Sequence, residues 1–571
     1  MKRTSKLFSI ERDEAGRKIM KVFVDGVALL RLPLINKGTG FTEDERIALG
    51  LDGLLPPLVN ELPQQVERVM LGYRDQTSDL AKYQYLRSLQ DRTETLFYAT
   101  LVSHLEEMLP IVYTPTVGDA VKKFHLLYQT PRGISLSARN IGRAKQAILN
   151  YPFEDVRMIV ATDASAILGI GDQGYGGLAI SIGKLALYTA GGGVAPVHTM
   201  PVVLDVGTER TDLRSDPLYL GVRERRLRGD EYIAFIDKFV EAVNERWPRA
   251  VIQWEDLSKD TAFTVLDRFR KVTPSFNDDI QGTGAVTLAG VLSACRLRGE
   301  RLRDQRVVIH GAGAGGMGVA LAIWRGMIAD GASPEDARAR VYVLDSKGLL
   351  TDDREMEEYK RVLAHPRAAI AAWPSSDGSP ELFETVEQAR ATVLLGLSGQ
   401  PRAFDRRVVE SMAKNTARPV IFALSNPTSS AEAIPTDILA WTRGTALVAT
   451  GSPFAPVTVD GKSVAIGQGN NAFIFPGLGF GAILSAAREI TDGMVQDASY
   501  ALVDFTKEHY PEHVYPPVSE LQRVSMLVAE RVYLRAMKDG VATAPARTAS
   551  EVRAYVESKF YRPEYLPVVR G

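Results

Sequence analysis

The feature that most limits the fold of this chain is a repeated alternation of short β-rich runs with helical stretches. The first series consists of VRMIVATD (156–163), PVVLDVG (201–207) and AVIQWED (250–256). The segment EYIAFIDKFVEAVNERW (231–247) between the last two runs has the apolar spacing of a helix. This βαβ rhythm predicts a parallel sheet with helices packed against it.

A second series of the same kind follows. We predict its strands in QRVVIHGAGAGG (305–316), VYVLDSKG (341–348), ATVLLGLSGQ (391–400), PVIFALSNPT (419–428) and TALVATGSPF (445–454). Each of these runs turns into small polar residues at its C-terminal end. In open α/β sheets ligands bind at that edge, so we expect a ligand site there.

The two ends of the chain have a different, helical texture. The first ~130 residues and the tail after ~490 carry apolar residues at helical spacing, and Thr42–Glu45 has the form of a capping box. A chain of 571 residues is also too long for a single core. We therefore predict an α/β fold with two parallel-sheet units, one a Rossmann-type dinucleotide-binding domain, and helical N-terminal and C-terminal regions.

Charge and composition exclude several functional classes. The 68 basic and 69 acidic residues give a net charge of -1, without the positive excess that nucleic-acid or membrane-surface binding needs. A single cysteine, Cys295, excludes an intramolecular disulfide and fits a reducing compartment. The N-terminus lacks the apolar core of a signal peptide, and the most apolar stretch (470–487) is interrupted by Pro476 and glycines, so we expect a buried segment and a cytoplasmic location.

The dinucleotide site is predicted in HGAGAGG, which contains G-x-G-x-x-G as Gly311, Gly313 and Gly316 between a strand and a helix. Glycines there permit a tight turn and a close approach of pyrophosphate to the helix N-terminus. Asp345 ends the next strand, where a carboxylate accepts from ribose hydroxyls. It comes later than the ~20 residues of the usual fingerprint, and the insertion at 330–340 explains the excess. A glycine-rich turn without a ligand is the alternative.

The choice of coenzyme stays open at this stage. Asp345 favours NAD, because a 2′-phosphate would meet a like charge. Ser346, Lys347 and Lys360 are nevertheless candidates for contacts with such a phosphate, which would favour NADP.

Two acidic pairs suggest a metal site. Asp278 and Asp279 lie in SFNDDIQGTG (275–284), and Glu255 and Asp256 end the strand AVIQWED. Strand-end acids from two segments would supply three oxygen ligands, which suits Mg²⁺ or Mn²⁺. None of the seven histidines has zinc-site spacing. Acidic pairs at strand ends are also often solvated, and spacing alone does not exclude that reading.

Two further residues are unusual in their surroundings. Lys184 lies in the otherwise uncharged run GLAISIGKLALYTAGGG (177–193), so it must extend its amine to the surface, pair with an acid or function with a lowered pKa. Tyr113 lies where the apolar run LPIVY meets a Pro-containing turn, and a packed ring with a satisfied hydroxyl is the alternative to a catalytic role.

Taken together, these motifs resemble those of malic enzymes. The matching segments occur in the family's order: PIVYTPTVG, ILGIGDQG, IGKLALYTA, QWEDL, FNDDIQGTG, HGAGAGG, LSNPT, ATGSPF and GQGNNAFIFPG. The resemblance runs from NKGTGFTEDER to about residue 540. It implies oxidative decarboxylation of L-malate to pyruvate and CO₂, with reduction of NAD or NADP and dependence on Mg²⁺ or Mn²⁺.

The resemblance also implies roles for individual residues. Glu255, Asp256 and Asp279 would bind the cation. Lys184 would be the general base, Tyr113 the general acid and Asp278 a partner of the lysine and the metal. The remaining implied contacts are those of Asn426 with substrate and coenzyme, Asn471 with substrate and Asn470 with the nicotinamide.

The family fold implies a domain order in which the dinucleotide domain interrupts the substrate domain. We expect a helical domain at 1–130, a substrate and metal domain at 131–277 completed by about 471–540, a dinucleotide domain at 278–470 and a tail at 541–571. Malate is then the small-molecule partner, and a homodimer or homotetramer is expected. Many eukaryotic members carry a carboxylate-binding arginine where Ala166 stands, so either another group binds that carboxylate here or the affinity for substrate is lower.

Two other functions compete with this one. A malolactic enzyme has the same fold, keeps NAD bound and releases lactate, and the stretch at 216–232 resembles that group. The motif TGSPF (450–454) favours the malic enzyme. A catalytically inactive nucleotide sensor would require the loss of a member among Tyr113, Lys184, Asp278 and Asp279, and all four are present.

Overall fold

The computed structural model describes residues 4–167, 169–374, 378–459 and 461–571 of the chain. By the contacts within it, the chain divides into two compact units. Unit 1 comprises residues up to Ser165, Asp172–Ile252 and Glu557–Gly571, and unit 2 comprises Ala166–Gly171 and Gln253–Val556. Among the described residues, none of the helices has both the length and the apolar character needed to cross a membrane.

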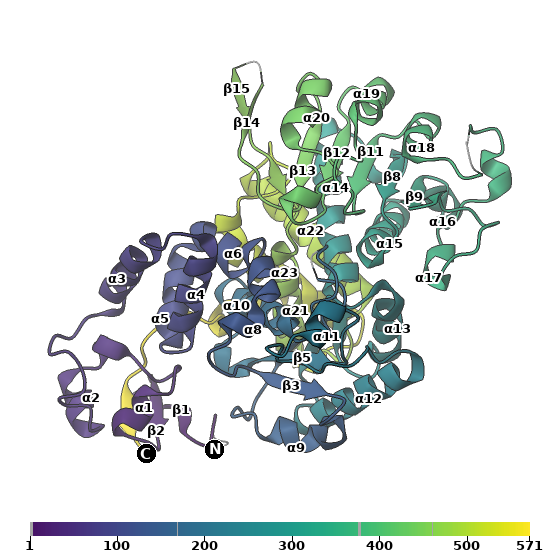
Figure 1. Cartoon of the computed structure of the whole chain (residues 1–571). Coiled ribbons are helices and arrows are strands. Elements are labelled where there is room, and N and C mark those ends of the chain that lie inside the picture. Colours follow the sequence, from purple (N-terminus) through teal and green to yellow (C-terminus); the bar gives the residue numbers. More distant parts are fainter. Residues whose placement is uncertain (1–3, 168, 375–377, 460) are drawn as a thin grey trace. The chain divides into compact units, whose positions relative to one another are not determined.

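Unit 1 contains the first predicted parallel sheet (Figure 1). Of the five strands of this sheet, β3 (Ile134–Ser137), β5 (Thr199–Asp205) and β4 (Met158–Thr162) lie wholly in unit 1, in that order and all parallel. Every residue of β4 and β5 is buried, as expected for strands covered on both faces. Helix α10 (Leu178–Ala190) packs on both strands with all of its residues buried, which explains its almost uninterrupted apolar sequence.

The N-terminal part of unit 1 is helical, as predicted. It contains α3 (Leu62–Arg74), α4 (Asp79–Gln90), α5 (Glu94–Ser103), α6 (Leu105–Val112) and α7 (Thr116–Lys122). The predicted capping box is also present at α2 (Glu43–Ala48). There the Thr42 hydroxyl accepts from the Glu45 amide at 3.2 Å, and the Glu45 carboxylate accepts from the Thr42 amide at 3.1 Å.

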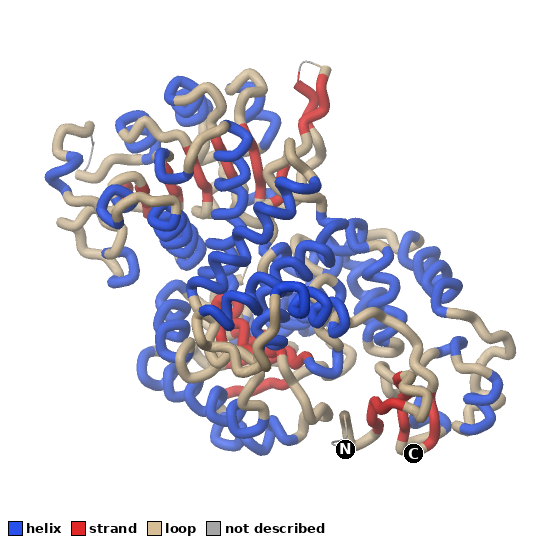
Figure 2. Tube along the Cα trace, turned by 180° about the vertical axis from the view of Figure 1, so that it is seen from behind, coloured by secondary structure: helices blue, strands red, loops and turns tan. Residues whose placement is uncertain are grey.

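The helical description of the chain ends needs one correction. A hairpin of β1 (Phe8–Arg12) and β2 (Lys18–Val22) precedes the helices, and β17 (Val568–Arg570) joins β2 in parallel. Figure 2 shows these strands beside the C-terminus. The β1 and β2 sequences, FSIER and KIMKV, lack the continuous apolar runs of the predicted strands. Strand β17 has only three residues, and its partner strand lies more than 500 residues earlier in the chain, which no local pattern shows.

Unit 2 contains the predicted Rossmann-type sheet. Its seven strands follow the order β10 (Gly348–Leu349), β9 (Val341–Asp345), β8 (Val307–His310), β11 (Val393–Gly396), β12 (Val420–Ala423), β13 (Leu447–Thr450) and β16 (Gly467–Gln468). All neighbours are parallel except β10 and β9. The chain runs outward from β8 to β9 and then returns to β11 on the other side of β8. Such a reversal of strand order is where dinucleotides bind.

A group of helices completes unit 2. Helix α21 (Phe475–Ser485) packs closely on α23 (Leu521–Lys538). Glycine at 477 permits this approach, since a Cβ atom there would lie 2.6 Å from the Val528 Cβ. The apolar stretch at 470–487 is therefore a buried segment, as predicted. Two further helices, α14 (Thr283–Arg298) and α22 (Asp492–His509), pack against each other.

Candidate functional site

Three carboxylates converge in unit 2 at the end of strand β6 (Val251–Glu255). One oxygen from each of Glu255, Asp256 and Asp279 lies within 4.8 Å of the others. Asp256 adopts a left-handed conformation with φ of 53°, and its amide donates to the Asp279 carboxylate at 2.8 Å. Backbone geometry thus turns the two neighbouring acids of QWEDL toward one point together with an acid from a later segment.

The electrostatics of this cluster call for a cation. Glu255 and Asp256 are only 2% and 3% exposed, and burying one carboxylate costs several kcal/mol unless it is compensated. Three acids this close also repel one another. The side-chain amide of Gln253 donates to the Glu255 carboxylate at 2.7 Å, which offsets part of the cost of burying it. A hard divalent ion with oxygen ligands fits the donor set.

The adjacent acids Asp278 and Asp279 occupy a π-helical turn, Asp278–Gly282 (η5), that follows β7 (Ser275–Asn277). π-Helical turns are rare in proteins, and those that occur are often found at functional sites. The side-chain oxygen of Asn277 accepts from the Ile280 backbone amide at 2.9 Å, and the side-chain oxygen of Gln281 accepts from the Asn277 backbone amide at 3.0 Å. The turn lets the two acids face different partners, in agreement with the prediction that they lie at a strand end.

Asp278 points to a residue that lies far away in the sequence. Its carboxylate accepts from the Asn471 amide at 2.9 Å, and that amide also donates to the Thr283 hydroxyl at 3.0 Å. Glycine is required at 282, because a Cβ atom there would overlap the Asp278 carboxylate. Two residues assigned by resemblance, Asp278 and Asn471, are therefore neighbours in unit 2.

In unit 1, the two remaining candidate catalytic residues also lie together. The Lys184 amine, 1% exposed, lies 5.1 Å from the centre of the Tyr113 ring. Tyr113 directly follows helix α6, and Gly183 allows α10 to approach it, since a Cβ atom at 183 would lie 2.9 Å from the Val112 carbonyl oxygen. The structure thus brings a buried amine next to a tyrosine.

The glycine loop has the shape of a phosphate cradle. It connects β8 to helix α15 (Ala314–Ala329). Gly311, with φ of 119°, and Gly316 have no room for a side chain, because a Cβ atom at either would overlap the Leu397 or the Gly311 backbone. Gly313 has no atom within 4 Å of such a Cβ, so this glycine faces open space. Packing does not require a glycine at 313, but a phosphate bound close to the helix N-terminus would.

Asp345 ends β9 in a cationic environment. Its carboxylate accepts from Arg354 at 2.7 Å, from the Lys347 amide at 2.9 Å and from Lys360 at 3.3 Å. Burial alone would raise the pKa of Asp345, but these contacts outweigh it and lower the pKa below its usual value. Arg354 was not predicted from the sequence, because nothing local distinguishes it from other surface arginines.

The asparagine candidates lie at the C-terminal edge of the same sheet or just after it. Asn426 follows β12, and its side-chain oxygen accepts from the Ser452 hydroxyl in the loop after β13. Asn470 is 5% exposed and accepts from the Ala472 amide at 2.9 Å, while its side-chain nitrogen is buried with no acceptor among the described residues. A buried amide of this kind suits contact with a ligand.

Ala166 contributes its backbone rather than a side-chain charge. Its amide donates to the Asp256 carbonyl oxygen at 3.0 Å. Three residues later, Gly169 (φ of 72°) lies against the Asn426 carbonyl oxygen, which a Cβ atom at 169 would approach to 2.8 Å. The short segment 166–171 thus contacts both Asp256 and Asn426, which the sequence did not indicate.

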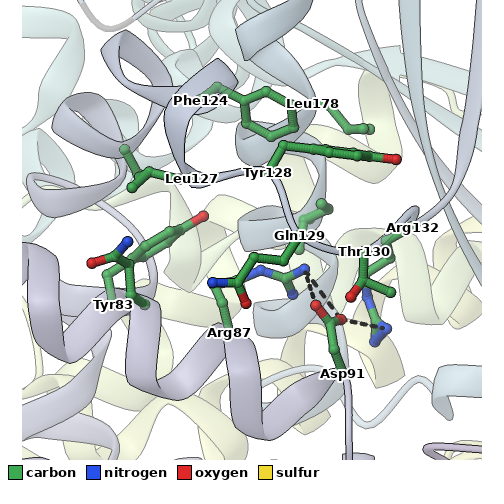
Figure 3. A pocket seen from close by; sticks show the side chains of 13 residues that line it. Tyr83, Arg87, Asp91, Phe124, Leu127, Tyr128, Gln129, Thr130, Arg132 and Leu178 are labelled. Atoms are coloured by element: carbon green, nitrogen blue, oxygen red, sulfur yellow. Dashed lines mark hydrogen bonds and ion pairs between the residues drawn. The ribbon is translucent and has the colours of Figure 1, made fainter. Parts of the chain in front are cut away.

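A cavity of about 50 Å³ in unit 1 is separate from these residues (Figure 3). Arg87 and Arg132 both reach Asp91 in its wall, at 3.3 and 3.7 Å, and Arg132 also pairs with Glu94. None of the predicted site residues lines it. Its charges are engaged by one another, so the cavity gives no reason to place a ligand there.

Comparison with known families identifies two matching regions. Residues 90–270 match the family model described as "Malic enzyme, N-terminal domain". Residues 280–537 match the model described as "Malic enzyme, NAD binding domain". These two regions cover most of the chain.

Individual relatives match over nearly their whole length. The NAD-dependent malic enzyme of Pectobacterium atrosepticum is 44% identical over 97% of this chain and 99% of its own. That of Aeromonas hydrophila is 45% identical over 95% and 96%. Among solved structures, the Entamoeba histolytica malic enzyme matches with a TM-score of 0.56 at 24% identity and covers 90% of each chain. The Pyrococcus horikoshii malic enzyme gives 0.53 at 25%, over 80% of this chain and 89% of its own.

Proposed function

The chain belongs to the malic enzyme family, and on that premise we propose that it oxidises and decarboxylates L-malate to pyruvate and CO₂ with NAD as coenzyme. The observation that carries this proposal is the buried cluster of Glu255, Asp256 and Asp279 in the unit that also holds the glycine loop. The names of the relatives, NAD-dependent malic enzymes at 44–45% identity, support the reaction and favour it over the malolactic alternative.

Glu255, Asp256 and Asp279 would hold Mg²⁺ or Mn²⁺. When bound, such an ion acts as a Lewis acid that lowers the pKa of an alcohol and stabilises negative charge on oxygen. The chain supplies the fixed geometry for it. The Gln253 amide orients Glu255, and the Asp256 amide holds Asp279 in place before any ion binds.

The coenzyme would bind along the loop at Gly311, Gly313 and Gly316, with Asp345 accepting from ribose hydroxyls. Asp345 is held ionised by Arg354 and Lys360, and its lowered pKa keeps a full negative charge there at neutral pH. A 2′-phosphate would meet this charge, which supports NAD over NADP. The coenzyme, when bound, accepts the hydride from C2 of malate.

Lys184 would take the proton from the C2 hydroxyl of malate as the hydride leaves, so it must be uncharged at that moment. Its burial favours the neutral amine. After CO₂ departs, Tyr113 would donate its phenolic proton to C3, and the adjacent Lys184 amine would return a proton to the tyrosine. The amine lies 5.1 Å from the ring centre, so the two side chains are neighbours, as this exchange requires.

Asn471 and Asn426 would bind substrate, Asn426 would also contact the coenzyme, and Asn470 would lie beside the nicotinamide. The orphaned side-chain nitrogen of Asn470 supports that assignment. Asp278 would hold Asn471 in position through their 2.9 Å hydrogen bond. Alanine at 166 supplies no guanidinium, so the asparagines would contribute more to binding the substrate carboxylate.

The domain bounds given above, a cytoplasmic location and a homodimeric or homotetrameric state belong to the same proposal. The two family models meet between residues 270 and 280, which supports a boundary near 277. Light scattering of the purified chain after gel filtration would measure the assembly state.

The reaction is tested by incubating the full-length chain with L-malate, NAD and Mn²⁺ and following both NADH absorbance and the organic product. We expect one NADH and one pyruvate per CO₂. Lactate and CO₂ without net NADH would show a malolactic enzyme instead, and no consumption of malate would contradict both. NADP in place of NAD should give a lower kcat/KM.

A further inference from the structure

Glu432 is a completely buried carboxylate that the site described above does not use. It lies between β12 and helix α20 (Pro435–Trp441) and is 0% exposed. Its oxygens accept from the Ser398 amide at 2.8 Å, the Ser398 hydroxyl at 3.0 Å and the Gly399 amide at 3.3 Å. They also accept from the Ser425 hydroxyl at 2.6 Å and the Ser425 amide at 3.4 Å.

These donors come from two different loops at one edge of the Rossmann-type sheet. Ser398 and Gly399 follow strand β11, and Ser425 follows the adjacent strand β12. The sheet leaves space for the carboxylate, because a Cβ atom at Gly396 would lie 2.5 Å from it. A buried charge costs several kcal/mol unless hydrogen bonds compensate it, so five donors on one anion are a strong constraint on both loops.

The constraint extends further along the same edge. Ser425 precedes Asn426, whose side chain accepts from Ser452 in the loop after β13. On the other side, the backbone of Leu397, just before Ser398, packs against Gly311 of the glycine loop. Glu432 therefore links the loops after β11 and β12, and the neighbouring loops contact these in turn.

The opposite end of the expected dinucleotide site lies at Asp345, after β9. The strand order β9-β8-β11-β12 puts three strand spacings, ~14 Å, between the ends of β9 and β12. The adenosine half would lie near Asp345, and the nicotinamide half would lie near the loops that Glu432 holds.

We propose that Glu432 is a positioning residue for the nicotinamide half of the coenzyme, which it reaches only through the Ser398 and Ser425 loops. This inference rests on the proposed function. It predicts that the two halves of the coenzyme depend on Glu432 to different degrees, whereas a merely structural residue would affect both halves equally.

The test is isothermal titration of the full-length chain with NAD⁺ and, separately, with ADP, which carries only the adenosine half. Glu432→Gln keeps the shape but replaces one acceptor oxygen with an NH₂ group that faces N–H and O–H donors. We expect the Kd for NAD⁺ to rise about 10-fold, equal to about 1.4 kcal/mol, with the Kd for ADP within two-fold of wild type. Glu410→Gln, which alters a partly exposed acid paired with Arg406 on α19 (Arg406–Asn415), is the matched control and should change neither Kd.

A second variant guards against misfolding. The double variant Ser398→Ala and Ser425→Ala removes two hydroxyl donors and leaves the carboxylate its backbone partners. We expect the Kd for NAD⁺ to rise selectively, by about 3-fold, which is less than for Glu432→Gln because only two hydrogen bonds are lost. Equal weakening of NAD⁺ and ADP, or no change for NAD⁺ in either variant, would overturn the inference. A wild-type chain that binds neither nucleotide would instead contradict the proposed function, and with it this inference.

Discussion

At the scale of single residues, the candidate site consists of polar groups that the fold has removed from water. The burial of Lys184 could be predicted from the sequence, because no other charge interrupts its apolar run. The partners of Asp278 and Asp345 could not. Asn471 follows Asp278 by 193 residues, and only the completed fold makes them neighbours.

Lys184→Met tests the general base. Methionine keeps the apolar stem in its buried position but removes the amine, so we expect kcat to fall by about 10²–10⁴-fold, the usual contribution of a general base. The Kd for NAD⁺ should stay within two-fold of wild type, because the groups proposed to bind the coenzyme, the glycine loop and Asp345 among them, do not include Lys184. Steady-state kinetics with an NAD⁺ titration measures both, and near-normal turnover would remove the assignment.

Asp345→Ala tests coenzyme choice. Without the carboxylate, the Arg354 and Lys360 charges lose their partner and become available to a 2′-phosphate. The ratio of kcat/KM for NADP to that for NAD should rise about 10-fold, equal to about 1.4 kcal/mol. Glu358→Ala, at an exposed acid paired with Arg361, is the control. An unchanged ratio would show that Asp345 does not determine selectivity.

At the scale of elements, strand ends and turns determine where the chemistry lies. The long β-rich runs were predicted correctly as β4, β5, β6 and the central strands of the Rossmann-type sheet. The strands β3 (ISLS), β7 (SFN) and β16 (GQ) were missed, because they lack the continuous apolar runs of the predicted strands and depend on their neighbours in the sheet. The position of Asp278 and Asp279 at a strand end was predicted, but the π-helical geometry of Asp278–Gly282 was not.

Gly282→Ala tests that turn. The new methyl group would overlap the Asp278 carboxylate and displace it from Asn471, while the rest of the turn keeps its backbone bonds. Because misplacing a reacting group by about 1 Å can cost 10²-fold, we expect kcat/KM for malate to fall by 10-fold or more. Gly142→Ala, where a Cβ atom meets nothing within 4 Å, is the control. Full activity in the Gly282 variant would show that Asp278 needs no fixed position.

At the scale of the whole molecule, segments distant in sequence complete each unit. Residues 166–171 belong to unit 2 although unit 1 precedes and follows them, and Glu557–Gly571 returns to unit 1. No local pattern predicts either. The expected return of the chain after 470 to the substrate domain came from family resemblance, and it remains a prediction.

Two buried histidines, His310 and His365, and the partly buried His198 give the stability of the fold a pH dependence. Burial lowers the pKa of His198, His310 and His365, aided at His198 by the nearby Arg157 charge. A lowered folded pKa means that the unfolded chain binds more protons. The stabilisation is therefore complete above the unfolded pKa near 6.5 and is lost as the pH falls toward the folded values.

We expect the free energy of unfolding to fall by about 1.4 kcal/mol per pH unit for each such histidine within its window. Urea denaturation between pH 7.5 and 5 measures this slope. The variant His365→Gln, which removes one of the three groups, should show a shallower slope than wild type. Identical slopes in the two proteins would contradict the account for His365.

The central claim is that Glu255, Asp256 and Asp279 together bind one divalent ion. Electron paramagnetic resonance of Mn²⁺ titrated into the coenzyme-free chain tests it most directly, with Asp279→Asn and, as a control, Asp267→Asn on the exposed face of α13 (Lys259–Phe269). We predict one saturable Mn²⁺ site per chain, with an affinity that the control leaves unchanged. Asp279→Asn should weaken that affinity at least ~100-fold, because even the loss of a residue that only hydrogen-bonds to a metal ligand costs 10–100-fold in metal affinity. Equal Mn²⁺ binding by wild type and Asp279→Asn would contradict the claim.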